Sequence, residues 1–458
     1  MTAIITDKIK RQFIQKLFNE AEGTSLGDSD NYFYIGVGRS QQWQPVLNTD
    51  TTPIPANTER EERTFRYNLQ AIKAIEAFSY VVPLKDWISN TTYAAYNDNI
   101  VGQPDQSYYV RTNDNHVYVC IRQGKNAAGS ANVSQFQPSH TDTTLPIQDD
   151  GYIWKYMYTI STADANSFLT SNFMPVKFID SAAVTDPYYG QYAIQNAAVP
   201  GQIIGYRVVS AGGTYSAPPA LTVVGSGSGA SAYAVLDATG SVSAVEVGDS
   251  DGVTNITNFL GTGYNQASVR VSDASLVSGV TAEIAPIFAQ KLGLGHDAIV
   301  DLRSTSIMYN IKPEASVDGK WIVNNDYRQI GLFKNITIFD SDAKFTGLKK
   351  VVLTTPVTGG LSWNTDTKLI GDSNAKGWID YWDDSATFWY HQDDQTGFVP
   401  FRDGEAVTIQ NKAGSFTIAE RVNPDIDIYS GDLLFINNTS FITRDELLTE
   451  DIKIVIKL

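Results

Sequence analysis

Few residues in this 458-residue chain have the types and spacing that catalysis requires. The best candidate for phosphate chemistry is YIGVGRSQQW (34–43), where an apolar run meets Gly36 and Gly38. A dinucleotide-binding loop needs a third glycine at position 41 and a helix after it, but Gln41 stands there and a Pro- and Thr-rich segment follows. The stretch therefore favours a strand that ends where glycine permits a close backbone approach, with Trp43 packed on it.

Metal and nucleophile motifs are weaker still. The four histidines lie far apart in the sequence, at His116, His140, His296 and His391. No two of them have a spacing suited to one metal ion. SGSGAS (226–231) lacks the strand-to-helix context of a nucleophile elbow, and GDSDG (248–252) lacks the ligand spread of a calcium loop. The sequence thus predicts no catalytic, cofactor-binding or metal-binding residue.

One cluster of aromatic and acidic residues leaves an alternative open. The segment GWIDYWDDSATFWYHQDD (377–394) contains the indoles of Trp378, Trp382 and Trp389 together with Asp380 and Asp383. Such residues could form a sugar-binding platform or the carboxylate pair of a glycosidase. Their alternation also fits a β-hairpin with aromatic core residues and Asp-rich turns, and we favour that interpretation. Glycan binding through Trp378, Trp382 and Trp389 remains the alternative.

Composition limits the classes of partner. Hydrophobic residues make up 42% of the chain and the formal net charge is −16. An acidic surface is repelled by phosphate backbones and anionic lipid, so we expect no binding to nucleic acid or membrane. The single cysteine, Cys120, excludes an internal disulfide framework. The sequence shows neither a signal-peptide pattern nor a long apolar run, so we expect a soluble protein made in a cytosol.

The elements that would position these residues are mostly strands. An amphipathic helix is expected near the start, capped by Thr6 or Asp7, and a second over 59–78. Strand patterns follow, most clearly at 116–123 and 150–160. Between 195 and 290, where Gly, Ser, Ala, Thr and Val dominate, the segment 209–236 is echoed by 260–287. We interpret this region as an inserted β module built from a degenerate duplication.

The predicted fold is mainly β and multi-domain, α+β at the N-terminus with two short helices. It has β-sandwich-like sheets and an inserted Gly/Ser-rich β-repeat module. The expected domains are 1–90 (N-terminal helices and strands of the core domain), 91–194 (a β domain with the DGYIWKY strand), 195–290 (the repeat module), 291–415 (an additional β domain) and 416–458 (C-terminal strands returning to the core domain).

Five sequence blocks resemble, in their order, those of a known family. The blocks are YIGVGRSQQW (34–43), VVPLKDW (81–87), VYVCIRQ (117–123), DGYIWKYMYTI (150–160) and the closing region from SGDLLFINN to LTEDIKIVIKL (430–458). The family is the dimeric baseplate wedge protein of T-even-type contractile-tailed phages, including its cyanophage and marine relatives. The resemblance covers residues 1–180 and about the last thirty, and the chain exceeds the short T-even form chiefly through 195–415.

The resemblance implies a structural role. The implied protein is a homodimer that contacts other baseplate wedge subunits, lies in the tail baseplate of the virion after synthesis in the host cytoplasm, and has no enzymatic activity, cofactor or small-molecule substrate. It would link neighbouring baseplate proteins and help transmit host attachment to sheath contraction. The family-signature structural residues are Gly36, Gly38, Arg39, Trp43, Pro83, Trp87, Asp150, Gly151, Trp154 and Gly431. The alternative function is a receptor- or glycan-binding tail protein that uses the aromatic cluster at 378–390.

Overall fold

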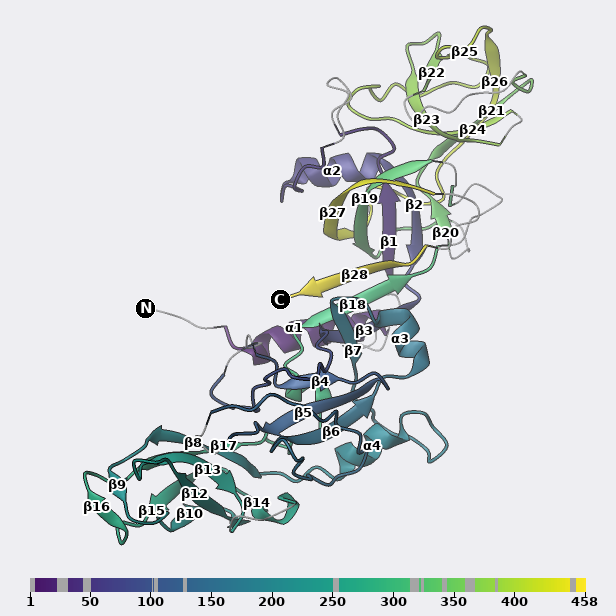
Figure 1. Ribbon diagram of the computed structural model, residues 1–458. Coiled ribbons are helices and arrows are strands. Elements are labelled where there is room, and N and C mark those ends of the chain that lie inside the picture. The colour runs from purple at the N-terminus through teal and green to yellow at the C-terminus, as the bar shows by residue number, and fades with distance from the viewer. Residues whose placement is uncertain are drawn as a thin grey trace. The chain divides into compact units, whose positions relative to one another are not determined.

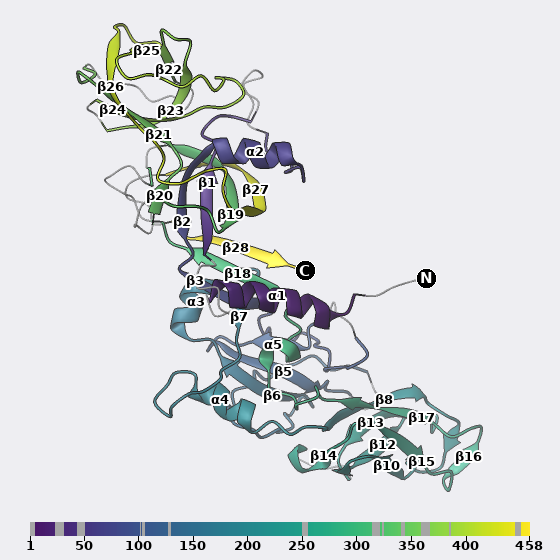
Figure 2. The same cartoon turned by 180° about the vertical axis from the view of Figure 1, so that it is seen from behind.

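The computed structural model describes residues 5–22, 32–43, 51–100, 102, 106–126, 130–249, 255–313, 321–322, 325–339, 344–358, 367–383, 386–444 and 450–458. Strands far outnumber helices among them, which confirms the predicted mainly β, multi-domain fold (Figures 1 and 2). The chain forms two compact units. The first unit contains residues 1–14, 79–308 and 456–458, and the second contains 15–78 and 309–455.

Strands from both ends of the chain share one five-stranded sheet in the second unit, with the order β20-β2-β1-β19-β27. The strands are β1 (Phe33–Gly38), β2 (Leu69–Ala74), β19 (Asp326–Lys334), β20 (Lys344–Thr346) and β27 (Asp432–Thr443). Every residue of the central strand β1 is buried. A Cβ atom on Gly36 would lie 2.8 Å from the ring of Phe333 and 2.9 Å from Leu69, so glycine is needed for the sheet to pack here.

The second predicted helix is wrong over its second half. Helix α2 spans only Glu59–Tyr67, and the chain then enters β2. Thr58 caps the helix by accepting a hydrogen bond from the Glu61 amide, and acidic residues occupy the first turn, where the helix dipole favours them. All but the last residue of β2 are buried, because the strand is covered on both faces. A strand of that kind has no polar alternation, and the spacing of its apolar residues resembles that of an amphipathic helix.

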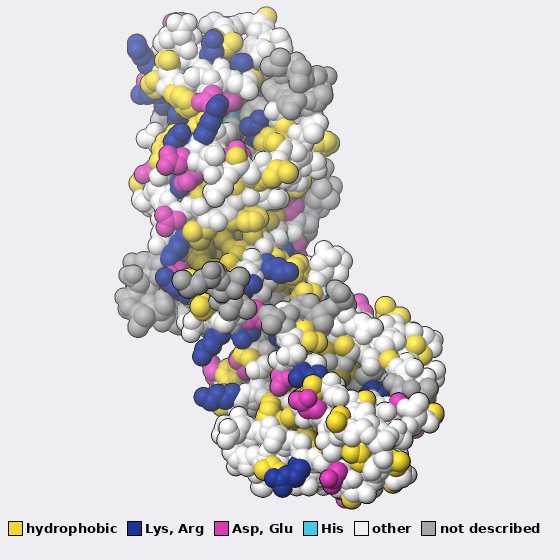
Figure 3. All heavy atoms as spheres, turned by 90° about the vertical axis from the view of Figure 1, so that its left-hand side faces the viewer, with side chains coloured by type: hydrophobic (Ala, Val, Ile, Leu, Met, Phe, Trp, Pro, Cys, Tyr) yellow, Lys and Arg dark blue, Asp and Glu magenta, His cyan; other side chains and the backbone are white. Residues whose placement is uncertain are grey.

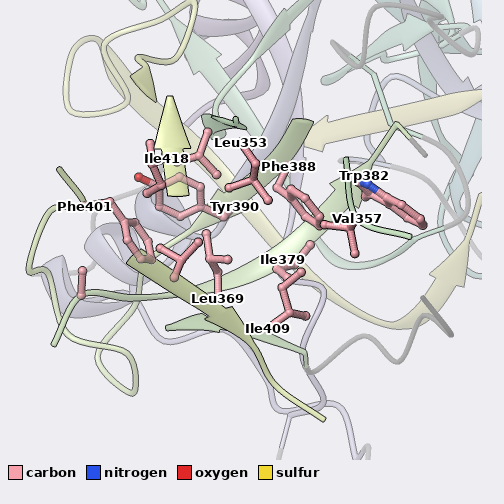
Figure 4. Close-up of a cluster of buried hydrophobic side chains, with 13 residues drawn as sticks. Leu353, Val357, Leu369, Ile379, Trp382, Phe388, Tyr390, Phe401, Ile409 and Ile418 are labelled. Atoms are coloured by element: carbon pink, nitrogen blue, oxygen red, sulfur yellow. The ribbon is translucent and has the colours of Figure 1, made fainter. Parts of the chain in front are cut away.

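The second unit also contains a closed six-stranded barrel, with the order β21-β24-β23-β22-β25-β26. Its strands are β21 (Lys349–Leu353), β22 (Lys368–Gly371), β23 (Lys376–Trp382), β24 (Thr387–His391), β25 (Ala406–Ile409) and β26 (Phe416–Val422). Phe388, Phe401 and Leu369 are completely buried in its core (Figure 4). Closure of the barrel removes its free sheet edges. The buried cluster inside it gives this part of the chain a hydrophobic core of its own.

A three-stranded sheet, β4-β5-β6, organises the first unit around an aromatic core. The elements are β4 (Tyr109–Arg111), β5 (His116–Arg122), β6 (Ile153–Thr159), α3 (Thr162–Phe168), α4 (Tyr189–Asn196) and α5 (Ala298–Asp301). The core contains Tyr93, Val110, Tyr118, Cys120, Tyr152, Trp154, Tyr156 and Ile194. Cys120 is a buried free thiol.

A further sheet, β28-β18-β3-β7, contains residues at which the chain passes from one unit to the other. Its strands are β3 (Ala77–Pro83), β7 (Phe173–Val176), β18 (Ser306–Ile311) and β28 (Ile452–Lys457). Helix α1 (Asp7–Ala21) also spans a unit boundary. No described helix is long and apolar enough to cross a membrane.

The Gly/Ser-rich region of the first unit forms five nested two-stranded ribbons, β8·β17, β9·β16, β10·β15, β11·β14 and β12·β13. The strands are β8 (Ile203–Ser210), β9 (Thr214–Tyr215), β10 (Leu221–Gly225), β11 (Ser228–Ala230), β12 (Ala232–Leu236), β13 (Val242–Val247), β14 (Leu260–Thr262), β15 (Ala267–Val271), β16 (Leu276–Ser278) and β17 (Glu283–Phe288), with the 3₁₀ turn η2 (Thr257–Phe259).

The two similar segments of this module pair with each other and do not form two separate copies. Strands β10 and β15 each follow a buried tyrosine, Tyr215 and Tyr264, and they pair antiparallel from Leu221↔Val271 to Gly225↔Ala267. Antiparallel pairing of equivalent strands relates the two segments by an approximate two-fold axis. The turn expected at 248–252 lies partly outside the described residues.

Candidate functional site

The GVGRSQQW segment forms the end of β1 and the turn after it. A Cβ on Gly38 would lie 2.5 Å from the Asn68 carbonyl oxygen, and Arg39 has a left-handed backbone with φ 64°. The Arg39 amide donates to the Asn68 carbonyl at 3.0 Å, and its guanidinium carbon lies 4.4 Å from the centre of the Trp43 ring. The Trp43 indole N–H donates to the Thr439 carbonyl on β27 at 3.1 Å. The segment is therefore held by hydrogen bonds to Asn68, which precedes β2, and to Thr439 on β27.

The next two residues enter a buried polar network with the barrel. The Ser40 hydroxyl donates to Asp380 Oδ1 at 2.8 Å, and Gln41 Nε2 donates to the Ser40 hydroxyl at 2.8 Å. His391 Nδ1 lies 2.5 Å from Asp380 Oδ2, while its Nε2 lies 3.1 Å from Gln41 Oε1. We call Ser40, Gln41, Asp380 and His391 the buried network; none of them is more than 3% exposed.

Neighbouring strands hold the network in place. Asn325 Nδ2 donates to the Asp380 carbonyl at 2.6 Å, and an Arg328 guanidinium N–H donates to the Ser40 carbonyl. Gln70 on β2 donates to the Asp326 carbonyl at 3.0 Å and approaches Asp380 Oδ1 at 3.5 Å. Because buried polar groups cost free energy unless they are hydrogen-bonded, this set of partners stabilises the junction between sheet and barrel.

Serine, histidine and aspartate are the residue types of a hydrolase triad, but their arrangement here differs from one. In a triad the histidine ring lies between the serine hydroxyl and the carboxylate. Here the Ser40 hydroxyl bonds directly to Asp380, and both ring nitrogens of His391 are engaged by other oxygens. All of these side chains are buried, so the arrangement joins parts of the fold and offers no nucleophile to a substrate.

Sequence reasoning did not find this network. In the sequence, Asp380 lies within the aromatic and acidic segment 377–394, and His391 is far from the other three histidines. The network joins positions that are 340 and 350 residues apart, so no local pattern could have connected them. In the described parts of the chain, no three His, Cys, Asp or Glu side chains are grouped closely enough to hold a metal ion.

The DGYIWKY segment forms a second set of buried contacts. Asp150 Oδ2 accepts hydrogen bonds from the amides of Gln135 at 2.8 Å and Phe136 at 3.3 Å, and Oδ1 accepts from the Tyr152 amide at 3.1 Å. Gly151 has a φ of 84°, which favours glycine. Trp154 is completely buried, with its ring stacked on that of Tyr152 at 5.8 Å. The carboxylate of Asp150 therefore serves as a local cap for three backbone amides.

The remaining signature residues also have structural contacts. Pro83 ends β3, and its carbonyl accepts a hydrogen bond from the Tyr109 hydroxyl at 2.8 Å. The Trp87 indole N–H donates to the Ser134 hydroxyl at 3.1 Å. Gly431, with a φ of 64°, precedes β27.

Substitution of Gly124, which the sequence did not single out, tests how closely the backbone packs against the DGYIWKY segment. A Cβ at Gly124 would lie 2.1 Å from the Asp150 carbonyl oxygen, so Gly124→Ala is expected to lower the free energy of unfolding by about 3 kcal/mol. Gly205→Ala is the matched control in the same unit, because its Cβ would meet only Ile287 at 3.6 Å; we expect a change within about 1 kcal/mol. Urea unfolding of both variants measures the difference. Equal effects would contradict the close approach of the backbones.

The three indoles proposed as a glycan platform are covered. Trp378, Trp382 and Trp389 are 6%, 7% and 7% exposed. The Lys368 amine lies 4.1 Å from the centre of the Trp378 ring, and Trp382 is stacked with Phe388 at 5.9 Å. A sugar-binding platform needs a ring face open to solvent. Trp382 instead packs in the barrel core, and Trp389 packs with Ile322 and Leu348.

A buried carboxyl in the first unit was also missed by the sequence reasoning. The Asp301 side chain is completely buried at the end of α5, and its Oδ2 accepts a hydrogen bond from the Gly295 amide at 2.8 Å. Burial raises the pKa of Asp301 to about 8. Burial also lowers the pKa of the nearby Lys155 amine. No sequence signal distinguishes this aspartate from a solvated one.

On the face shown in Figure 3, positive and negative side chains are interspersed among hydrophobic and neutral ones. Charge therefore singles out no site on that face. The chain matches no protein-family model, and the search of curated proteins finds no match either.

Proposed function

We propose that the chain is a structural subunit of a contractile phage tail baseplate wedge. In this role it links neighbouring baseplate proteins and helps transmit host attachment to sheath contraction. The proposal rests on the order of the five sequence blocks, from YIGVGRSQQW to the closing LTEDIKIVIKL. It includes a homodimer, contacts with other wedge subunits and a place in the virion, and it requires no cofactor or turnover.

The observation that supports this proposal best is that residues of the five sequence blocks form buried hydrogen bonds that hold elements of the fold together. Ser40 and Gln41 of the first block form hydrogen bonds within the buried network, and Asp150 of the fourth block accepts hydrogen bonds from backbone amides. Residue types capable of chemistry thus stabilise packing between elements, as a load-transmitting subunit requires. No observation favours glycan binding over this function, since the Trp378, Trp382 and Trp389 rings are covered.

Cross-linking mass spectrometry on intact particles of the source phage tests the proposal. We expect amine-reactive cross-links from this chain to several other baseplate subunits. Links that join the same lysine in two copies, for example the 73% exposed Lys16, can arise only between molecules and would establish self-association. Cross-links only to a fibre or tip protein, or absence of the chain from the particles, would overturn the wedge assignment.

A further inference from the structure

A small, mostly apolar cavity of the first unit lies where the three-stranded sheet meets the Gly/Ser-rich module. Its volume is about 120 Å³. Strand β5 contributes Ile121 to the walls, and the module contributes Ile204 from β8 and Leu260 from β14. Lys155 of β6 is the only charged side chain among the described residues that line it. An apolar cavity of about 150 Å³ holds a benzene molecule, so this cavity suits a compound of a few non-hydrogen atoms.

The alternation of β6 turns Lys155 toward the cavity. Its neighbours Trp154 and Tyr156 belong to the aromatic core on one face of the sheet. Successive side chains of a strand point to opposite faces, so Lys155 leaves that core and lies on the face where the cavity is. The side chain is half-buried, which means that part of it remains accessible to solvent.

The amine of Lys155 lies beside the 294–295 segment and has no partner there. A Cβ atom on Gly295 would lie 2.9 Å from Lys155 Cε and 3.6 Å from Nζ, and Leu294 lines the cavity. In the described part of the chain, no hydrogen bond and no ion pair involves Nζ. Because an unpaired ammonium in apolar surroundings is costly, this position favours the neutral amine.

Two other covered lysines show what a paired amine looks like in this fold. Lys73 Nζ lies 2.5 Å from Glu76 Oε1. Lys177 Nζ lies 2.5 Å from Asp164 Oδ1. Lys155 lacks such a carboxylate, so its amine is not committed to an ion pair that holds the fold together.

The electrostatic surroundings act in the same direction. Burial lowers the pKa of the Lys155 amine, and an ionised Asp301 would oppose that change. Burial also raises the pKa of Asp301 to about 8, so at neutral pH this carboxyl keeps its proton and supplies little negative charge. His140, whose pKa is lowered by burial, is the other titratable group in the surroundings of the amine. A neutral lysine amine in an apolar cavity is a nucleophile.

The walls restrict what this amine can meet. Carboxylates and phosphates lose their hydration on entering an apolar cavity, whereas small neutral molecules enter at little cost. Among neutral molecules, aldehydes and ketones have the carbonyl carbon that a lysine amine attacks. Thr143, Gln202 and Thr257 also line the cavity and have side-chain groups that can hydrogen-bond a carbonyl oxygen. The cavity therefore suits an aliphatic carbonyl compound of a few carbon atoms.

We propose that Lys155 is a nucleophilic amine that forms a reversible imine with a small aliphatic aldehyde or ketone held in this cavity. The nitrogen attacks the carbonyl carbon to give a carbinolamine. A carbon–nitrogen double bond then forms, and the carbonyl oxygen leaves as water with the two amine protons. This reactivity goes beyond the proposed wedge function and does not rest on it.

Reductive labelling of the full chain tests the proposal. The chain is treated at pH 7 with propanal and cyanoborohydride, which converts an imine into a stable propyl amine, and peptide mass spectrometry gives the initial labelling rate of each lysine. Lys291, an exposed lysine of the same unit, is the internal control. We expect Lys155 to be labelled at least about tenfold faster than Lys291, because each unit by which a pKa falls raises the neutral fraction about tenfold. Equal or slower labelling of Lys155 overturns the proposal.

A larger aldehyde and a pair of variants test whether the cavity is responsible. Pyridoxal phosphate is bulky and anionic, so we expect it to label Lys291 but not Lys155. Ala197→Phe places a ring at an exposed position that lines the cavity and is expected to slow propanal labelling of Lys155 at least about fivefold. Ala193→Phe is the matched control, since Ala193 is exposed on α4 and does not line the cavity.

The labelling of Lys291 by propanal is expected to be the same in both variants, which shows that each remains folded and that the reagent is unchanged. The cavity is excluded as the reactive site if Ala197→Phe and Ala193→Phe label at Lys155 equally fast. It is also excluded if pyridoxal phosphate labels Lys155 as fast as it labels Lys291.

Discussion

Raising the pH from 4 to 9 is expected to reduce the stability that Asp301 contributes to the first unit. The folded protein holds the Asp301 proton up to about pH 8, whereas an unfolded aspartate loses it near 3.8. The contribution is therefore fully present below pH 3.8 and is lost as the pH rises through about 8. Each pH unit between these values corresponds to about 1.4 kcal/mol for a fully buried group, so the total effect amounts to several kcal/mol.

The Asp301→Asn variant isolates this effect from other titrations. Asparagine keeps a carbonyl oxygen for the Gly295 amide but carries no ionisable proton, so its melting temperature is expected to exceed that of the wild type at pH 8.5 and to match it near pH 4. Other titratable groups near Asp301 are Lys155, Asp297, Tyr96 and Tyr108. They are common to both proteins and cancel in the comparison to first order.

Asp142→Asn is the control for the Asp301 experiment. Hydrogen bonds from Thr144 lower the pKa of this exposed carboxyl, so its contribution is present at neutral pH and is lost in acid. The control is therefore expected to gain no stability at pH 8.5. If the melting curves of wild type and Asp301→Asn run parallel from pH 4 to 9, Asp301 is ionised throughout and the prediction is wrong.

Removal of the Asp380 carboxylate is expected to lower the free energy of unfolding of the second unit by about 3–5 kcal/mol. Asp380→Ala leaves His391 Nδ1 and the Ser40 hydroxyl without their acceptor in a buried site. Breaking one partner of a buried polar pair costs more than the pair contributes, because the other partner stays desolvated. Urea unfolding followed by tryptophan fluorescence suits this measurement, since Trp378, Trp382 and Trp389 lie buried in the same unit.

Asp403→Ala is the matched control for Asp380→Ala. Asp403 of the same unit forms an ion pair with Arg421 at 2.8 Å, but both side chains are largely exposed and water screens the pair, so only a small loss is expected. A double-mutant cycle of Asp380→Ala with His391→Ala is expected to show strong coupling, because each single change already disrupts the network. A loss for Asp380→Ala no larger than that for Asp403→Ala would contradict the role of the buried network.

Local patterns in the sequence determined the fold class and many individual strands. The alternation at 116–123 and 150–160 predicted β5 and β6, because side chains on successive strand residues point to opposite faces. The same reasoning failed at β2, where both faces are buried and the alternation that marks a strand disappears. The Gly/Ser-rich duplication was also visible locally. The nested pairing of its strands could not be predicted, because the similarity between the two segments does not indicate which strands pair.

Only the tertiary structure decided what the motif residues do. The sequence placed Ser40 and Gln41 after a strand and excluded a phosphate loop, but it did not indicate that they bond to Asp380 and His391 in the barrel. The burial of Trp378, Trp382 and Trp389, by contrast, agrees with the β-hairpin with aromatic core residues that the alternation at 377–394 favours. The spacing of residues in the sequence indicates which side chains are neighbours within one helix or strand. Contacts between residues hundreds of positions apart, and the desolvation of Asp301, arise only when separate elements pack.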